Sequence, residues 1–271
     1  MRRKLTISAF LALFIGVTAS AHDLFLKLDS YFLQPNSKAS VRLLNGTFQK
    51  SDGTVSRERF RDISLFAPEL RGPIGELVTW RDEGKTTVME IQTGVPGTYL
   101  VGVSTKPREI SLKAAEFNDY LQHDGLPDTL AERKKNNDLN KDVRERYSKH
   151  VRAIFQVGDK LSDDCKSPLN YPVEIIPQQK PYSLRVGQII TVLCVLKGQP
   201  LVDQFVMAGW ESRDGKLRTI NARTDVSGLA RFELTGTGKW YVKMIYMTPL
   251  AEPNLDYESK WATLTFEIRN G

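Results

Sequence analysis

Short segments with alternating apolar residues, separated by turn residues, restrict the fold of this chain more than any other feature. The segment DLFLKL places Leu24, Leu26 and Leu28 on one face of a strand. Similar segments follow between Gly, Pro, Asp and Asn residues, namely SVRLLNGTF, DISLFAP, ELVTW, TTVMEIQT and GTYLVGVST. Short strands at regular spacing are typical of β-sandwiches. We therefore predict an all-β fold.

The same pattern returns in the second half of the chain. From Tyr171 onward the strand-like segments are VEIIP, QIITVLCVL, QFVMAGWES, LRTINAR, LARFELT, KWYVKMIYM and WATLTFEI. Seven short strands in about 100 residues match an immunoglobulin-like or transthyretin-like sandwich. We predict two tandem sandwiches, at residues 22–158 and 171–271, joined by a polar linker at residues 159–170.

Helical spacing interrupts the first predicted sandwich after about residue 111. Ala114, Phe117 and Leu121 recur at intervals of three and four, with Ser111 as the expected N-cap and Gly125 as the stop. This pattern predicts a first helix.

Two further helices are expected in the same region. Pro127 opens the segment PDTLAERKKN, and the segment DVRERYSKH places Val143, Tyr147 and Val151 four residues apart. We predict a helical insertion at about residues 111–150 of the first sandwich.

The N-terminus has the three parts of a secretory signal peptide. Arg2, Arg3 and Lys4 precede an uncharged apolar run, which ends in Ala19-Ser20-Ala21. The run is too short to span a bilayer. We predict that residues 1–21 are the signal peptide and that cleavage falls between Ala21 and His22. The mature chain would be periplasmic or secreted, without a stable membrane span.

Charge and motif content narrow the function further. The 271-residue chain has a formal net charge of +6, and removal of 21 residues with three basic side chains leaves 250 residues and a charge of +3. No basic cluster is interleaved with aromatic residues, so we expect no nucleic-acid partner. Serine-hydrolase, zinc-protease and phosphate-loop motifs are missing, so we expect a non-catalytic protein with no catalytic residues.

Cys165 and Cys194 leave two alternatives open. An oxidising compartment favours a disulfide between them. The apolar segment TVLCVL around Cys194 instead favours a buried free thiol.

The three histidines are the candidate metal ligands. After cleavage, His22 would carry a free α-amine, which together with Nδ1 of its ring can chelate one metal ion. His123 or His150 would complete a nitrogen site for nickel, cobalt or copper. A copper-dependent oxidative enzyme would use the same chelate with a second close histidine and an open coordination face.

Several stretches resemble one exported bacterial family. They are AHDLFLKLDSYFLQPN, LLNGTF, GTYLVGVSTKP, EFNDYLQHDGL, ERYSKHVRAIFQVG, TDVSGLARFEL and YESKWATLTFEI. The chain resembles a domain-of-unknown-function family often labelled nickel-uptake-like or cobalt/nickel-transport-associated periplasmic protein. The resemblance implies β-sandwiches, a periplasmic location and metal handling, with a metal transporter or outer-membrane receptor component as partner. It supplies no catalytic residues.

Two functional hypotheses follow. The first is a periplasmic metal-binding or uptake-accessory protein for nickel, cobalt or copper. The alternative is an adhesion or interaction module that binds protein or glycan without metal. An exposed aromatic patch from Trp80, Trp210, Trp240 or Trp261 would favour the alternative, whereas buried tryptophans would belong to the core.

Overall fold

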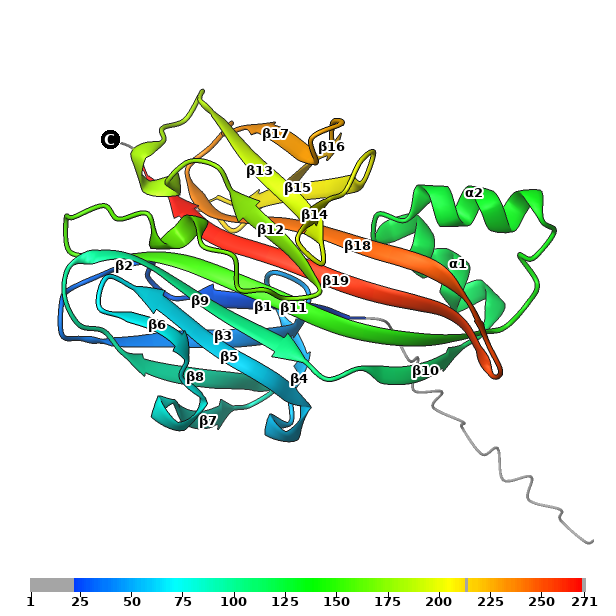
Figure 1. Cartoon of the computed structure of the whole chain (residues 1–271), viewed down its shortest axis with the longest axis horizontal. Coiled ribbons are helices and arrows are strands. Elements are labelled where there is room, and N and C mark those ends of the chain that lie inside the picture. Colours follow the sequence, from blue (N-terminus) through cyan, green and yellow to red (C-terminus); the bar gives the residue numbers. More distant parts are fainter. Residues whose placement is uncertain (1–21, 213, 270–271) are drawn as a thin grey trace, which may run out of the picture.

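The fold is mostly β, as the sequence predicts. The computed structural model describes residues 22–212 and 214–269, in which the strands form three sheets and two α-helices are present. Figure 1 shows the three sheets as stacked layers, with β18 and β19 of the central sheet extending to the end of the molecule where the helices lie. The predicted signal peptide, residues 1–21, lies outside the described residues.

The three sheets contain five, ten and four strands. The five-stranded sheet consists of β1 (Asp23–Leu28), β3 (Lys38–Gly46), β4 (Ser51–Gly53), β7 (Thr79–Glu83) and β8 (Thr86–Gln92). The ten-stranded central sheet consists of β2 (Phe32–Leu33), β5 (Phe60–Ala67), β6 (Leu70–Pro73), β9 (Gly97–Thr105), β10 (Arg108–Leu112), β11 (Val143–Val157), β15 (Phe205–Glu211), β16 (Leu217–Arg223), β18 (Gly238–Glu252) and β19 (Leu255–Ile268). The four-stranded sheet consists of β12 (Val173–Pro177), β13 (Ile189–Leu196), β14 (Gln199–Pro200) and β17 (Leu229–Glu233).

Strand β11 joins the two halves of the chain. It pairs in parallel with β19, from the Glu145–Tyr257 pair to the Ala153–Thr265 pair, and antiparallel with β9 and β10 on its other side. The central sheet therefore contains strands from both predicted domains. The domain division at residues 159–170 stays a prediction.

The two faces of the central sheet carry separate hydrophobic cores. On β11, Val151, Ala153 and Phe155 belong to the core formed with the five-stranded sheet, whereas Ile154 belongs to the core formed with the four-stranded sheet. This division follows from the alternation of side chains along a strand. The molecule is thus layered, with one small sheet on each face of the central sheet (Figure 1).

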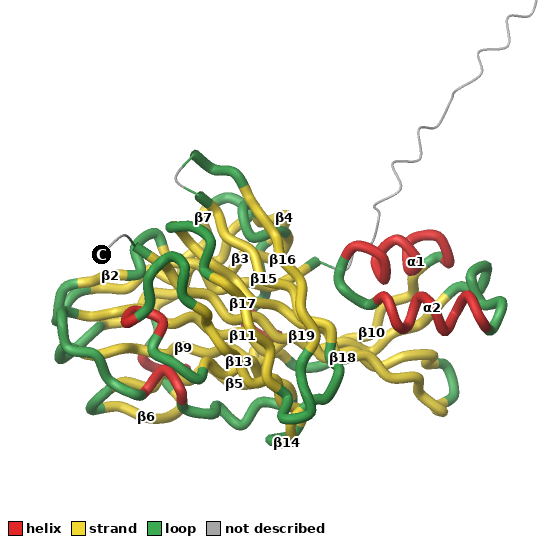
Figure 2. The backbone as a smooth tube through the Cα atoms, turned by 90° about the horizontal axis from the view of Figure 1, so that it is seen from above, coloured by secondary structure: helices red, strands yellow, loops and turns green. Residues whose placement is uncertain are grey.

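Two helices pack at one end of the molecule, beside the distal part of the β18–β19 hairpin (Figure 2). They are α1 (Ala114–His123) and α2 (Pro127–Lys135), and the buried Phe117 and Leu121 of α1 share a core with Trp261 of β19. The first two predicted helices are confirmed, although Lys113 occupies the N-cap position expected for Ser111. Among the described residues, no helix has the length and apolar character needed to span a membrane.

The third predicted helix is wrong, and the helical part of the insertion ends well before residue 150. Val143, Tyr147 and Val151 lie on strand β11. A spacing of four residues is close to one helical turn, but it is also an even number, so such residues share one face of a strand as well. A spacing of four residues alone therefore cannot distinguish a helix from a strand.

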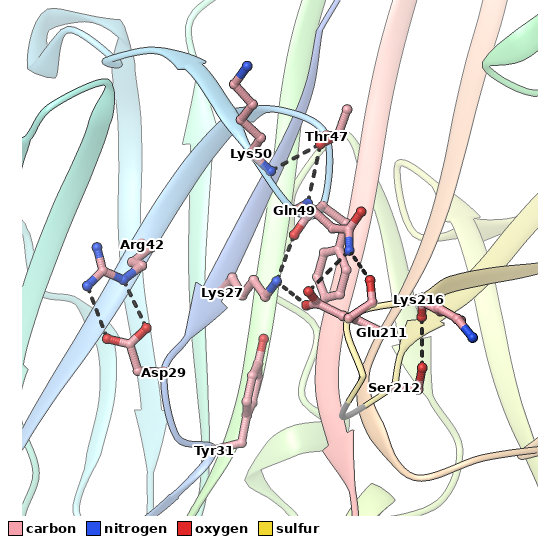
Figure 3. Close-up of polar contacts among 12 residues, drawn as sticks. Lys27, Asp29, Tyr31, Arg42, Thr47, Gln49, Lys50, Glu211, Ser212 and Lys216 are labelled. Carbon is pink, nitrogen blue, oxygen red and sulfur yellow. Dashed lines mark hydrogen bonds and ion pairs between the residues drawn. The ribbon is translucent and has the colours of Figure 1, made fainter.

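A polar bridge fixes β1 against the second half of the chain (Figure 3). Lys27 of β1 donates to the carbonyl of Phe48 at 2.9 Å and to the carboxylate of Glu211 on β15. Gln49 donates through Nε2 to the same carboxylate at 3.2 Å and to the carbonyl of Gly215 at 2.7 Å. These contacts hold β1, and therefore His22 at its start, over the central sheet.

Candidate functional site

A cavity of about 220 Å³ lies at the start of β1, where β9 ends and β10 begins beside β11. Its lining combines apolar and charged side chains from widely separated segments. They are His22, Leu24, Asn45, Thr54, Val55, Ser56, Arg59, Thr105, Arg108, Ile110, Glu145, Tyr147, Lys149 and Trp261. We call this cavity the Lys149 pocket.

One face of β11 supplies the deepest polar groups of the Lys149 pocket. Glu145, Tyr147 and Lys149 alternate along the strand and therefore project to the same side. Glu145 is 1% exposed and Lys149 is 6% exposed. Ionisable side chains are seldom buried this deeply unless they are paired or functional.

Among the residues that the structure describes, no carboxylate contacts the amine of Lys149. Its Nζ donates to the main-chain carbonyl of His22 and lies 5.6 Å and 5.3 Å from the ring centroids of Tyr147 and Trp261. Burial lowers the pKa of Lys149 to about 8, and the positive charge of Arg59 acts in the same direction. The side chain is held by one carbonyl and two aromatic rings, which leaves two of its three N–H groups for a ligand.

Glu145 offers an oxygen that the protein does not use. Its Oε1 accepts hydrogen bonds from Tyr120 at 3.3 Å and from Ser259, whereas its Oε2 is buried and has no hydrogen-bond partner among the described residues. Burial raises the pKa of Glu145 to about 7. The carboxyl group can therefore accept or donate a hydrogen bond near neutral pH.

Arg59 supplies a second unsatisfied group. Its guanidinium lies 5.4 Å from the ring centroid of Tyr147 and donates to the Tyr147 hydroxyl at 3.4 Å, but its buried Nε has no partner. Within the described part of the chain, the buried side-chain polar atoms without a partner are this Nε, Oε2 of Glu145 and Oδ1 of Asp23. Arg59 and Glu145 line the pocket, and Asp23 directly follows the lining residue His22.

The structure places one predicted metal ligand in the Lys149 pocket and the other two elsewhere. His22 lines the pocket, and its Nδ1 lies 3.4 Å from a carboxylate oxygen of Asp52. His123 is exposed at the end of α1, where its Nδ1 is 2.9 Å from the carbonyl oxygen of Asp119.

His150 faces away from the Lys149 pocket. It follows Lys149 on β11 and therefore points to the opposite face of the central sheet. There its two ring nitrogens lie 2.9 Å and 3.0 Å from the hydroxyls of Ser104 and Ser148. The three histidines are not brought together. In residues 22–212 and 214–269, no three His, Cys, Asp or Glu side chains are grouped to hold a metal ion.

Both cysteines and three of the four tryptophans are buried. Cys165 and Cys194 are both free thiols, and burial raises their pKa values to about 11 and about 12. Trp210 and Trp240 stack in the core beneath the four-stranded sheet. Trp261 is buried beside the Lys149 pocket, and Trp80 is half-buried against Phe60. The tryptophans therefore match the expectation of core residues and form no exposed patch.

Sequence reasoning missed Lys149, Glu145 and Arg59 as site residues. The signal was present in the segment ERYSK, where Glu145, Tyr147 and Lys149 stand at every second position. Interpreted as a strand, this segment would have predicted one polar face.

Comparison with known protein families gives one match that covers most of the chain. The model of the family described as "Domain of unknown function (DUF4198)" matches residues 19–248. No curated protein sequence matches the chain.

Two similar solved structures come from adhesion proteins. The D0–D1 domain of Intimin is 14% identical with a TM-score of 0.21, over 88% of this chain and 95% of that chain. A tetra-tandem repeat in the extending region of a large adhesion protein is 9% identical with a TM-score of 0.23, over 92% of this chain and 50% of that chain. Scores this low carry no argument about function.

Proposed function

The chain belongs to the DUF4198 family of domains of unknown function, and from this premise we propose that it is a non-catalytic protein that binds a compact organic ligand in the Lys149 pocket. The ligand would carry a hydrogen-bond acceptor, such as a carbonyl or carboxylate oxygen, and a small apolar part.

One observation carries this proposal. Lys149 and Glu145 are buried on the same face of β11 and both line the cavity, yet neither pairs with the other. Four residues span about 13 Å along a strand, so the two polar ends of the pocket are well separated. Leaving Oε2 of Glu145 without a hydrogen bond and the Lys149 ammonium without a contacting carboxylate costs free energy, which a matching ligand would recover.

The walls between the two ends restrict the size and nature of the ligand. Leu24, Val55, Ile110 and Trp261 provide apolar surface. A cavity of about 220 Å³ is smaller than the roughly 300–1,000 Å³ of sites for drug-sized ligands. A short branched acid, alcohol or oxo compound would match both the volume and the chemistry.

Export forms part of the proposal. The basic, apolar and small-residue segments at the N-terminus support removal of residues 1–21 and a periplasmic or secreted mature chain that begins at His22.

The two hypotheses from the sequence have less support. A nickel, cobalt or copper site would need a second histidine near His22, but His123 is exposed at the end of α1 and His150 is buried on the opposite face of the central sheet. An adhesion module would be supported by an exposed aromatic patch, whereas the tryptophans pack into the cores. The Lys149 pocket gives a more specific basis for function.

Calorimetric titration of the mature protein with 3-methylbutanoate and 3-methylbutan-1-ol tests the proposal. At roughly 0.6 kcal/mol for each non-hydrogen atom, the acid should bind with a Kd of about 1 mM. Lys149→Met keeps most of the length of the side chain and removes its charge, so it should weaken binding of the acid more than that of the alcohol. Lys85→Met, at an exposed position, is the matched control. The proposal fails if neither compound binds or if Lys149→Met binds the acid as the wild type does.

A further inference from the structure

We propose that Lys149 forms a covalent imine with an aldehyde or ketone ligand in the Lys149 pocket. The inference rests on the proposed function, because the carbonyl compound must first enter the same cavity. It adds the ligand class and the atom to which the ligand becomes attached.

The first argument is the contrast between two buried lysines. Lys149 and Lys243 are each 6% exposed. Lys243 donates to the carboxylates of Asp23 at 2.6 Å and Asp124 at 2.9 Å, which hold it as an ammonium ion. No carboxylate in the described part of the chain contacts Lys149, which donates to a neutral carbonyl instead. A buried amine without a counter-ion is driven toward its neutral, nucleophilic form.

The second argument is access. The fold buries Lys243 beneath β1, whereas Lys149 lines a cavity large enough for a small molecule. The aromatic faces of Tyr147 and Trp261 flank its amine and restrict the directions from which a ligand can approach. The lowered pKa of Lys149, about 8, supports the same assignment, since a substantial fraction of the amine is neutral near pH 7.5.

The reaction needs no reactant besides the ligand. The lone pair of Nζ attacks the carbonyl carbon, a C–N bond forms, and the electrons of the C=O double bond move to oxygen. Nitrogen loses a proton and oxygen gains one, which gives a carbinolamine. The hydroxyl leaves as water after a second protonation, and the lone pair of nitrogen forms the C=N bond of a protonated iminium. The iminium then loses its remaining N–H proton to give the neutral imine.

Glu145 lies at the other end of the same cavity and can exchange these protons through water. It supplies a carboxyl group to the lining, and its Oε2 is not engaged by the protein. A carboxyl group whose pKa is about 7 can donate and accept protons near neutral pH. Water in the cavity would carry the proton over the remaining distance.

Reductive trapping of the mature protein tests the inference. The protein is incubated near pH 7.5 with 3-methylbutanal and sodium cyanoborohydride, and the modified lysines are located by peptide mass spectrometry. Lys149 should be alkylated at least roughly tenfold faster than the exposed Lys85, because far more of its amine is neutral. Lys243, equally buried, should stay unmodified, and the peptide map separates both from the α-amine of His22.

The outcomes separate this inference from the proposed function. If 3-methylbutanal competes with 3-methylbutanoate for the pocket but Lys149 is alkylated no faster than Lys85, the imine is wrong and ligand binding stands. If neither compound binds, both proposals fail. The trapping experiment uses the wild-type chain, so its result does not depend on whether a Lys149 variant folds. Lys149→Met should lose the Lys149 product and keep the slow labelling of Lys85.

Discussion

Lys149 and Lys243 hold two consecutive residues at the start of β1, since Lys149 donates to the carbonyl of His22 and Lys243 donates to the carboxylate of Asp23 at 2.6 Å. The lysines come from β11 and β18, which flank β19 in the central sheet. Their different environments shift the pKa values of the two amines in opposite directions. The pKa of Lys149 is lowered to about 8 by burial, whereas Asp23 and Asp124 raise that of Lys243 despite burial.

The stability of the protein should therefore rise with pH in one alkaline window. Between about pH 8 and 10.5 the unfolded chain keeps the proton on Lys149 and the folded chain has released it, so the free energy of unfolding increases with pH. Relative to Lys149→Met, the wild type should gain up to about 3 kcal/mol across this window. Urea denaturation at several pH values measures the difference.

The groups that act on Lys149 stay present in this comparison. Asp23, Glu145 and Asp124 raise its pKa and Arg59 lowers it, and none of them is changed in Lys149→Met. A difference between the two proteins that stays constant with pH would contradict the prediction.

Glu145 should give a pH effect of the opposite slope. Its pKa is raised by burial from 4.5 to about 7, so between these values the folded chain holds a proton that the unfolded chain has lost. The free energy of unfolding should therefore fall as pH rises through this window. Glu145→Gln should remove this pH dependence and be more stable than the wild type above about pH 7.

The variant Glu109→Gln, at an exposed position, is the control, and denaturant titrations at about pH 5 and 8 measure the free energy of unfolding. If the free energy of unfolding changes with pH equally in the wild type and Glu145→Gln, the Glu145 carboxyl does not titrate between about pH 5 and 8.

The mostly-β fold could be predicted because apolar alternation reports directly which strand face is buried. Leu24, Leu26 and Leu28 are buried as the pattern of DLFLKL predicts. The first helix was equally clear, because Ala114, Phe117 and Leu121 include an interval of three, which no single strand face can accommodate.

The pocket could not be predicted because it depends on long-range pairing. Parallel pairing of β11 with β19 brings Lys149 beside Trp261, which lies more than a hundred residues later in the chain. Nothing local in either segment specifies this partner or its register. In addition, Glu145 and Lys149 are charged, and charged residues at alternate positions usually indicate a solvated face. Burial of these two charges is visible only in the folded structure.

The buried ion pair between Arg152 and Glu174 should be essential for stability. Each side chain is 3% exposed, and Glu174 also accepts from the main-chain N–H groups of Leu169 and Tyr171 at 2.8 Å and 3.2 Å. Glu174→Gln leaves a buried guanidinium without its counter-charge and should cost about 3–5 kcal/mol. The double variant Arg152→Met/Glu174→Gln should recover part of this loss.

A surface ion pair provides the control for this prediction. Nη2 of Arg146 lies 2.9 Å from a carboxylate oxygen of Glu252, and because Arg146 is half-buried and Glu252 exposed, solvent screens their attraction. Glu252→Gln should change the midpoint of urea unfolding far less than Glu174→Gln does. Similar losses in the two variants would mean that the buried pair contributes no more than a surface pair.

Removal of either distant histidine should leave metal affinity unchanged. His123 is exposed at the end of α1, and both ring nitrogens of His150 are within hydrogen-bonding distance of serine hydroxyls on the face away from His22. Titration of the mature chain with Cu(II) and Ni(II) should give the same affinity for the wild type, His123→Gln and His150→Gln. A loss of about tenfold or more in either variant would restore the shared site predicted from the sequence.

His150 should instead make the protein sensitive to acid. Burial, with the nearby charges of Lys260 and Arg61, lowers its pKa from 6.5 to about 3, so below about pH 6.5 only the unfolded chain gains a proton there. The free energy of unfolding should fall as pH falls, by roughly 1.5 kcal/mol between about pH 6.5 and 5 from this group. His150→Gln should lose this part of the slope, although it also disturbs the contacts with Ser104 and Ser148 and lowers stability at every pH. The slope, not the absolute value, is therefore the test, with His123→Gln as the exposed control. If His150→Gln and the wild type lose stability in parallel between about pH 6.5 and 5, His150 is not the group that responds to acid.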